Sequence, residues 1–178
     1  MTKTILVVDD ESSIRDALSK VLHAEDYEVV SAENGLEAIE KFGAEKIDLL
    51  LLDLGLPVKD GWDTLKWLAE VNPLLPVIII TGRWQQRELA EKAGADALMD
   101  KPLNVPCLLQ TIRELVDEPV ECRAQRAKNR TSGFRHVSCD HELFIKGLND
   151  RFTTPYKNNL PRIEGPLNYR RHDLEPDN

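Results

Sequence analysis

Short, mostly apolar runs alternate along the chain with longer stretches in which apolar residues recur every three or four positions. Runs of the first kind, such as Thr4–Val8 and Ile47–Leu52, lack the polar alternation of a half-exposed strand, so they predict strands buried on both faces. The stretch Ser12–His23 instead has its apolar residues at helical spacing, which predicts an amphipathic helix with Ser12 near its N-terminal cap.

The same two patterns repeat five times in the first two-thirds of the chain. The remaining predicted strands are Glu28–Ala32, Pro76–Ile80 and Ala97–Met99, and the remaining predicted helices are Gly35–Phe42, Trp62–Val71, Arg87–Ala93 and Val105–Val116. A helix after every strand predicts an α/β fold with a doubly wound, five-stranded parallel sheet and helices on both faces. In open sheets of this kind the ligand site lies beyond the carboxyl ends of the strands.

Ionisable or hydroxyl side chains follow four of these predicted strands. Asp9 and Asp10 follow the first and Asp53 the third, whereas Thr81 follows the fourth and Lys101 the fifth. Three carboxylates brought together repel one another unless a cation lies among them, and hard oxygen ligands suit Mg²⁺. A lysine and a hydroxyl beside that cation would neutralise and hydrogen-bond a phosphoryl group. The pattern therefore indicates a magnesium-dependent phosphoryl site.

Each of these residues also has a plain structural interpretation. An isolated aspartate at the end of a strand, as Asp53 is, usually forms a cap or a turn. Asp9 and Asp10 also suit the start of the next helix, where the helix dipole favours acidic side chains. Taken alone, Thr81 is an ordinary strand-end residue and Lys101 an ordinary surface lysine. The occurrence of all five at strand ends of one sheet favours the phosphoryl site.

The order of these residues resembles the receiver domain of two-component response regulators. The matching pieces are the acidic pair, Asp53 within LLLLDLGLP, and then Pro57, Gly61, Thr81-Gly82, the GAD of Gly94–Asp96 and Lys101-Pro102. The resemblance covers residues 3–116. It implies a flavodoxin-like (βα)5 fold, in a receiver domain that we place at residues 1–118.

The resemblance also implies a chemical role for the acidic residues. Asp53 would accept a phosphoryl group from a phosphohistidine on a sensor histidine kinase or a phosphotransfer protein. Asp9 and Asp10 would bind Mg²⁺ together with Asp53 and the backbone carbonyl of Gly55. The chemistry would be limited to phosphorylation and autodephosphorylation of Asp53, and the signal would pass to an output protein by direct binding.

On the same resemblance, Thr81 would move to hydrogen-bond a phosphoryl oxygen, Lys101 would pair with the phosphoryl group, and Pro102 would follow a cis peptide bond. Two positions depart from the family's pattern. Leu98 stands where the family usually has an aromatic residue that turns inward as the threonine moves, and Leu103 stands where Phe is frequent. Because residue 98 has no ring to swing, we expect other packing changes to couple the site to the surface.

The remainder of the chain, residues 119–178, has a different composition. It carries 11 Lys+Arg against 8 Asp+Glu, whereas residues 1–118 carry 12 against 23. Leu, Ile, Val and Phe make up only 12 of its 60 residues, close to the level at which chains no longer bury enough surface to fold. We therefore predict a boundary near Asp117–Pro119 and a poorly structured extension with one short helix at His141–Asn149. Its removal is expected to leave the melting temperature nearly unchanged.

The sequence leaves three classes of function open. The first is a phospho-accepting switch, and the second is a transcriptional regulator whose basic extension binds DNA, or an RNA, without a helix-turn-helix pattern. The third, a hydrolase with a strand-end aspartate, would need a second acid two residues after Asp53, where Gly55 stands. A metal site at His136, Cys139 and His141 lacks a suitably spaced fourth ligand.

The chain also carries no signal for a membrane. No apolar run approaches the roughly 20 residues that span a bilayer, and the first residues lack the features of a signal peptide. Three scattered cysteines suit a reducing compartment. We therefore expect a cytoplasmic protein.

Overall fold

A computed structural model describes residues 2–57, 60–83, 85–128 and 134–137. Strands and helices alternate along the receiver region as predicted, each within two residues of its predicted ends. The strands are β1 (Thr4–Val8), β2 (Glu28–Ala32), β3 (Leu49–Asp53), β4 (Val77–Thr81), β5 (Ala97–Asp100) and β6 (Arg135–Val137). The helices are α1 (Ser12–His23), α2 (Gly35–Ala44), α3 (Gly61–Val71), α4 (Arg87–Ala93), α5 (Val105–Val116) and α6 (Val120–Lys128).

The strands form one parallel sheet in the order β2-β1-β3-β4-β5-β6. The predicted sheet is correct for its first five strands, and the structure adds a sixth. Strand β6 comes from the extension and pairs with β5, where the prediction left an open edge. The sequence-based expectation of five strands is therefore corrected to six.

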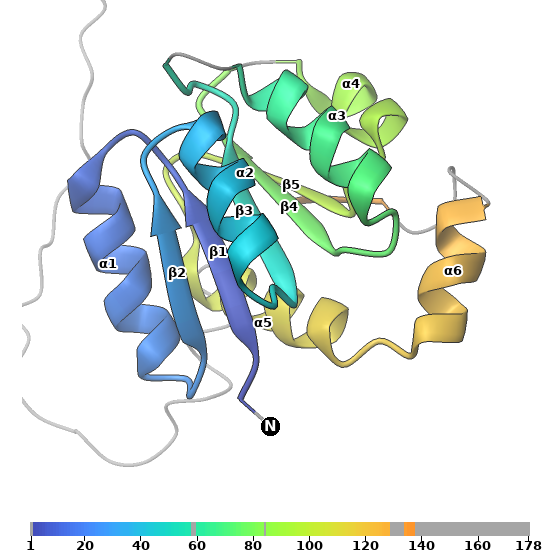
Figure 1. The fold of residues 1–178 in the computed structure, drawn as a ribbon, viewed down its shortest axis with the longest axis horizontal. Coiled ribbons are helices and arrows are strands. Elements are labelled where there is room, and N and C mark those ends of the chain that lie inside the picture. Colours follow the sequence, from blue (N-terminus) through green and yellow to red (C-terminus); the bar gives the residue numbers. More distant parts are fainter. Residues whose placement is uncertain (1, 58–59, 84, 129–133, 138–178) are drawn as a thin grey trace, which may run out of the picture. The chain divides into compact units, whose positions relative to one another are not determined.

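The sheet separates two apolar cores because successive residues of a strand point to opposite faces. Leu6 and Val8 lie in the core beneath α2, α3 and α4, which we call the front core. Ile5 and Val7 lie in the core beneath α1 and α5, which we call the back core. Figure 1 shows α2 in front of the strands and α5 behind them. The central strands are thus buried on both sides, as their uninterrupted apolar sequences predicted.

Local signals in the sequence fix most helix ends. The side chain of Asn34 caps α2 by accepting hydrogen bonds from the backbone N–H groups of its first turn. Gly94 ends α4 in the left-handed conformation with a φ of 89°, which favours glycine. The N-cap of α1 is Glu11, which makes no side-chain capping bond, so Ser12 begins the helix instead of capping it. None of the described helices is long and apolar enough to cross a membrane.

Part of the extension packs on the receiver region. On α6, Arg123 donates hydrogen bonds to the carbonyls of Leu115 and Glu118, at 2.9 and 3.1 Å. Phe134, just before β6, packs on the front core, and Val137 packs on the back core. Among the described residues, α6 and β6 therefore belong to the same compact unit as the receiver strands and helices, and the boundary near residue 118 stays a prediction. The helix predicted at His141–Asn149 lies outside the described residues.

Candidate functional site

The predicted site residues converge at one edge of the sheet. Asp9 directly follows β1, Asp53 ends β3, Thr81 ends β4 and Lys101 directly follows β5. Asp9, Asp53 and Thr81 are buried. Because the strands are parallel, their carboxyl ends meet on the same side of the sheet, and this topology brings the four residues together.

The ammonium group of Lys101 joins the two buried carboxylates. Its Nζ lies 2.7 Å from Oδ2 of Asp53 and 2.9 Å from Oδ2 of Asp9. Burial acts to lower the pKa of Lys101, but the hydrogen bonds and charges of Asp53 and Asp9 outweigh it, so this pKa lies above its usual value. Lys101 is therefore a fixed positive charge at neutral pH, directly beside the predicted phosphoacceptor.

Backbone groups hold the other oxygen of each carboxylate. Oδ1 of Asp53 accepts a hydrogen bond from the Gly55 N–H at 2.9 Å. Oδ1 of Asp9 accepts one from the Glu11 N–H at the same distance. The guanidinium of Arg15 also donates to the backbone carbonyl of Asp9 at 2.6 Å. Both carboxylates are thus fixed in orientation by donors on each of their oxygens.

Asp9, Asp10 and Asp53 form the cluster from which the sequence predicted a metal site. One carboxylate oxygen of each residue lies within 4.8 Å of the others, and Asp10 is exposed to solvent. Oxygen ligands on one open side fit a magnesium ion, which binds through one or two carboxylates and keeps several waters. We call these three residues the acidic cluster. The role of the Gly55 carbonyl as a further ligand remains a prediction.

Two other positions that match the family's pattern, Pro102 and Gly61, have the backbone features expected there. The peptide bond between Lys101 and Pro102 is cis, as expected from the resemblance. A side chain at Gly61 would place its Cβ 2.7 Å from the carbonyl oxygen of Asp53 and from the Cα of Leu54. Only glycine therefore lets the start of α3 approach the end of β3 this closely.

The hydroxyl of Thr81 lies at the same edge of the sheet. Its Oγ1 accepts a hydrogen bond from the backbone N–H of Arg83 at 3.0 Å. The next strand is tied to it through the backbone, since the Lys101 N–H donates to the Thr81 carbonyl at 2.8 Å. Thr81 is thus joined through the backbone to the residue that follows β5.

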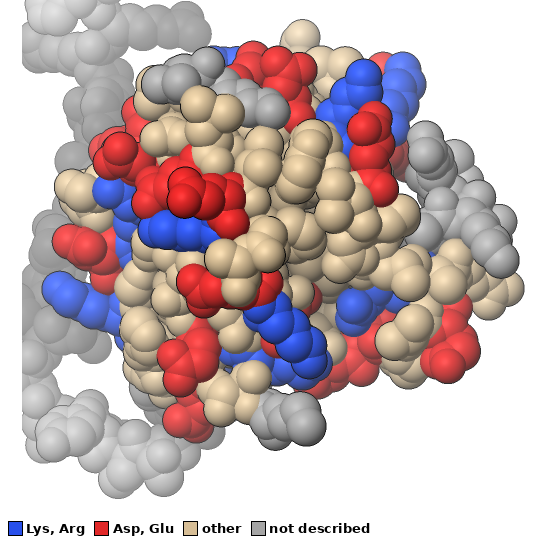
Figure 2. Space-filling view, in the orientation of Figure 1, with Lys and Arg blue, Asp and Glu red and all other residues tan. Residues whose placement is uncertain are grey.

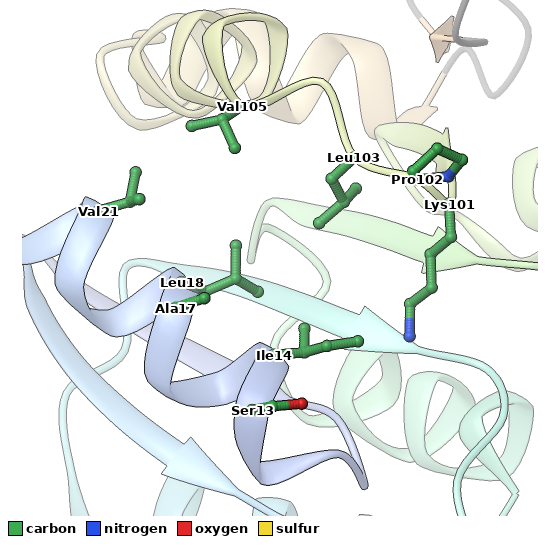
Figure 3. A pocket seen from close by; sticks show the side chains of 9 residues that line it. All are labelled: Ser13, Ile14, Ala17, Leu18, Val21, Lys101, Pro102, Leu103 and Val105. Carbon is green, nitrogen blue, oxygen red and sulfur yellow. The ribbon is translucent and has the colours of Figure 1, made fainter.

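An apolar groove of about 370 Å³ adjoins the site. It lies between α1 and the loop that joins β5 to α5, and Figure 3 shows Ile14 and Leu18 of α1 on the side opposite Leu103. Lys101 forms one end of its lining, so the groove leads to the ammonium that binds Asp53.

Several functional contacts escaped the sequence-based prediction. No motif in the sequence marked Arg15 as a partner of Asp9. The only signal was its position, one turn into the helix that follows the acidic pair. The contact between the side chains of Asp100 and His136, at 3.1 Å, joins residues 36 positions apart and left no local signal. Of His136, Cys139 and His141, which the sequence analysis weighed as a metal site, only His136 lies among the described residues.

The fold and the site together define a flavodoxin-like (βα)5 domain with an acidic cluster and a lysine at its carboxyl edge. The chain belongs to the response regulator receiver domain family, whose model matches residues 5–113. The response regulator TrrA from Thermotoga maritima, whose structure was determined in complex with Mg²⁺ and BeF, is similar in fold. Its TM-score is 0.60 at 35% identity, over 64% of this chain and 99% of TrrA.

Curated relatives differ in how much of their length is matched. The chemotaxis protein CheY of Halobacterium salinarum is 32% identical over 119 residues, which cover 65% of this chain and 98% of CheY. The alkaline phosphatase synthesis transcriptional regulatory protein PhoP of Bacillus subtilis is 39% identical over 106 residues. Those residues cover 58% of this chain but only 44% of PhoP. The matched region is thus nearly all of one relative and less than half of the other.

Proposed function

We propose that this receiver accepts a phosphoryl group on Asp53 from a phosphohistidine of a sensor histidine kinase or a phosphotransfer protein. It then signals by phosphorylation-dependent binding to an output protein. The observation that carries the proposal is the position of Lys101 Nζ, within 3 Å of oxygens of both Asp53 and Asp9. The protein turns over no separate substrate, because its chemistry is confined to gain and loss of the phosphoryl group on Asp53.

The transfer joins a carboxylate oxygen of Asp53 to phosphorus and breaks the phosphorus–nitrogen bond, so the donor imidazole leaves with the bonding electrons. Lys101 neutralises charge on the phosphoryl oxygens, and Thr81 donates its hydroxyl hydrogen to one of them. The acidic cluster would hold a Mg²⁺ ion, which supplies further charge neutralisation when bound. The donors from Gly55 and Lys101 keep the attacking carboxylate oriented, which lowers the entropic cost of the reaction.

The apolar groove supports a protein as the phosphoryl donor. Its lining is nearly all apolar side chains of α1 and the β5–α5 loop, and it leads to Lys101. A helix that presents its apolar face to this groove would bring a phosphohistidine to Asp53. A small phosphoryl donor would make no use of such a surface.

The test is phosphorylation of the intact chain by acetyl phosphate, or by a phosphohistidine protein, in the presence of Mg²⁺. We expect one acid-labile phosphoryl adduct by intact-mass spectrometry, and no adduct on Asp53→Asn. The matched control is Asp63→Asn, which removes an exposed carboxylate from α3 and should leave labelling unchanged. Equal labelling of wild type and Asp53→Asn would exclude this assignment.

A DNA-binding regulator is the second candidate, because PhoP is named as a transcriptional regulator. Two observations weigh against it. Arg135 is paired with Glu114, and Arg123 donates to backbone carbonyls, so neither of these extension residues offers a free charge to phosphate. On the face in Figure 2, basic and acidic side chains are interspersed over α2 and α3. Salt-dependent DNA binding that is lost on deleting residues 119–178 would favour this candidate.

A further inference from the structure

Strand β6 covers the edge of the sheet that β5 would otherwise expose. Residues Ala97–Met99 of β5 pair in parallel with Arg135–Val137. The backbone N–H of Arg135 donates to the carbonyl of Asp96 at 3.0 Å, which begins the pairing. An uncovered edge strand presents unpaired backbone groups to any other chain, so β6 occupies a surface with intrinsic affinity for partners.

Side chains on both faces hold β6 in place. Phe134 packs on the front core and Val137 on the back core. Arg135 forms an ion pair with Glu114 of α5. His136 contacts the carboxylate of Asp100 at 3.1 Å, and these two side chains are 28% and 37% exposed.

The attachment of β6 is therefore small. It consists of three paired residues, two partly buried apolar side chains, one solvent-accessible ion pair and the polar contact between His136 and Asp100. An exposed pair of this kind contributes little on its own. Segments with few buried contacts and accessible hydrogen bonds open at the lowest free energy in a protein. Strand β6 can thus leave the sheet without unfolding the rest of it.

One of these contacts lies next to the phosphoryl site. Asp100 directly precedes Lys101, and it is paired in register with Thr81. The Lys101 N–H is also bound to the Thr81 carbonyl at 2.8 Å. The two residues that would bind the phosphoryl group are therefore joined through the backbone to the residue that holds His136.

We propose that β6 is a displaceable edge strand, and that phosphorylation of Asp53 weakens its attachment to β5. This inference rests on the proposed function. A phosphoryl group draws the Thr81 hydroxyl and the Lys101 ammonium toward its oxygens, away from the Arg83 N–H and Asp9 contacts that they make now. The ends of β4 and β5 shift with them, and the Asp100–His136 contact is lost.

Leu98 has no aromatic ring that could swing, so another packing change must couple the site to the surface. Displacement of β6 is such a change. Leu98 is fully buried in the front core and pairs in register with His136. Release of β6 uncovers the paired edge of β5 and frees the carboxylates of Asp100 and Glu114. Phosphorylation of Asp53 thereby makes the β5 edge of the sheet accessible to a partner.

The coupling must act in both directions, because linkage between two equilibria is reciprocal. If phosphorylation releases β6, then the chain with β6 released must bind a phosphoryl analogue at Asp53 more tightly by the same factor, and a substitution that populates the released state must strengthen binding by up to that factor. Beryllofluoride with Mg²⁺ is a suitable analogue, since its binding is an equilibrium that can be measured directly.

The first experiment is hydrogen exchange on the full chain with and without beryllofluoride and Mg²⁺. We expect the amide of Arg135 to exchange roughly fivefold faster or more with beryllofluoride, the low end of typical coupling, while amides of β2, the opposite edge, stay unchanged. Asp53→Asn should abolish the response. Binding of beryllofluoride without faster exchange at Arg135 would overturn the inference but leave the proposed function intact. Failure of beryllofluoride to bind wild type would count against the proposed function itself.

The second experiment compares variants of β6. His136→Ala and Arg135→Gln should each speed exchange in β5 and β6 and tighten beryllofluoride binding, by up to the factor by which beryllofluoride itself speeds exchange at Arg135. Lys92→Gln is the control, because it breaks an exposed ion pair with Glu88 on α4, remote from β6 in the sequence, and should change neither quantity. Variants that release β6 yet bind beryllofluoride with unchanged affinity would also overturn the inference.

Discussion

At the scale of single residues, the positive charge of Lys101 allows two buried carboxylates to lie close together. Two buried carboxylates would be costly beside each other, because burial and mutual repulsion both disfavour their charged forms. Lys101 binds one oxygen of each and offsets the repulsion, whereas the exposed Asp10 is not among the acids it contacts. The three acids therefore differ in their partners: Asp9 and Asp53 share the positive charge of Lys101, whereas Asp10 does not contact it.

This difference predicts the effect of neutralising Asp10. In metal-free buffer Asp10→Asn should be as stable as wild type or more stable, by up to about 1 kcal/mol, since a like charge within 4.8 Å of the other two carboxylates is removed. With Mg²⁺ the same variant should fail to become phosphorylated. Chemical denaturation measures the stability of the variant, and intact-mass spectrometry measures its phosphorylation.

The control for Asp10 is Asp9→Asn, which removes a charge that Lys101 contacts. That variant should lose stability, because the lysine keeps only one of its two carboxylate partners. A less stable Asp10→Asn would contradict the shared acidic cluster.

At the scale of elements, side chains close together in the sequence stabilise the N-terminus of α2 by capping hydrogen bonds. Oδ1 of Asn34 accepts hydrogen bonds from the N–H groups of Leu36 and Glu37, both at 3.0 Å. The Glu37 carboxylate reaches back to the N–H of Glu33 at 2.8 Å and pairs with Lys41 one turn later. The reciprocal bonds satisfy backbone donors that the first helical turn leaves unpaired.

These contacts predict a pH dependence. The hydrogen bond from Glu33, followed by the contact with Lys41, lowers the pKa of Glu37 below its usual value of 4.5. A lowered folded-state pKa means that this stabilisation is present above pH 4.5 and is lost as the pH falls through the lower value. Glu37→Gln should therefore cost about 0.5 kcal/mol near neutral pH and flatten the loss of stability below pH 4.5. Denaturation midpoints measured from pH 3 to pH 7 test this, with Glu40→Gln as an exposed control on the same helix.

At the scale of the whole molecule, part of the extension is integral to the receiver unit. Helix α6 is tied to the unit by Arg123, whose guanidinium donates to carbonyls of Leu74, Leu115 and Glu118. Phe134 and Val137 add apolar contact to both cores. The expectation that the extension contributes nothing to stability is therefore replaced.

Truncation after Asp117 should now lower the stability of the protein. We expect a loss of about 2 kcal/mol relative to a chain that ends at His141, because two partly buried apolar side chains and the bonds of Arg123 are removed. Thermal and chemical denaturation of the two truncated chains measure the difference. Equal stability would mean that α6 and β6 add nothing to the fold, and it would also remove the basis for a coupled edge strand.

The sequence by itself determined the first five strands, their helices and the site residues. Strands such as Leu49–Asp53 are continuous apolar runs, and α5 is a regular amphipathic repeat, so each signal lies within a few neighbouring residues. The location of the site could be predicted because parallel strands end on the same side of a sheet, whatever side chains they carry. Asp9, Asp53, Thr81 and Lys101 could therefore be placed together without any knowledge of a distance.

Only the tertiary structure decided the sixth strand, the attachment of α6 and the contacts of individual atoms. Strand β6 is three residues long, too short for alternation to appear, and it lies in a segment of low apolar content. Its partners Asp96, Asp100 and Glu114 are at least 20 positions away, so their pairing depends on how the whole chain packs. A pattern along the sequence records which faces are buried locally, whereas which distant groups meet on those faces is set by three-dimensional packing alone.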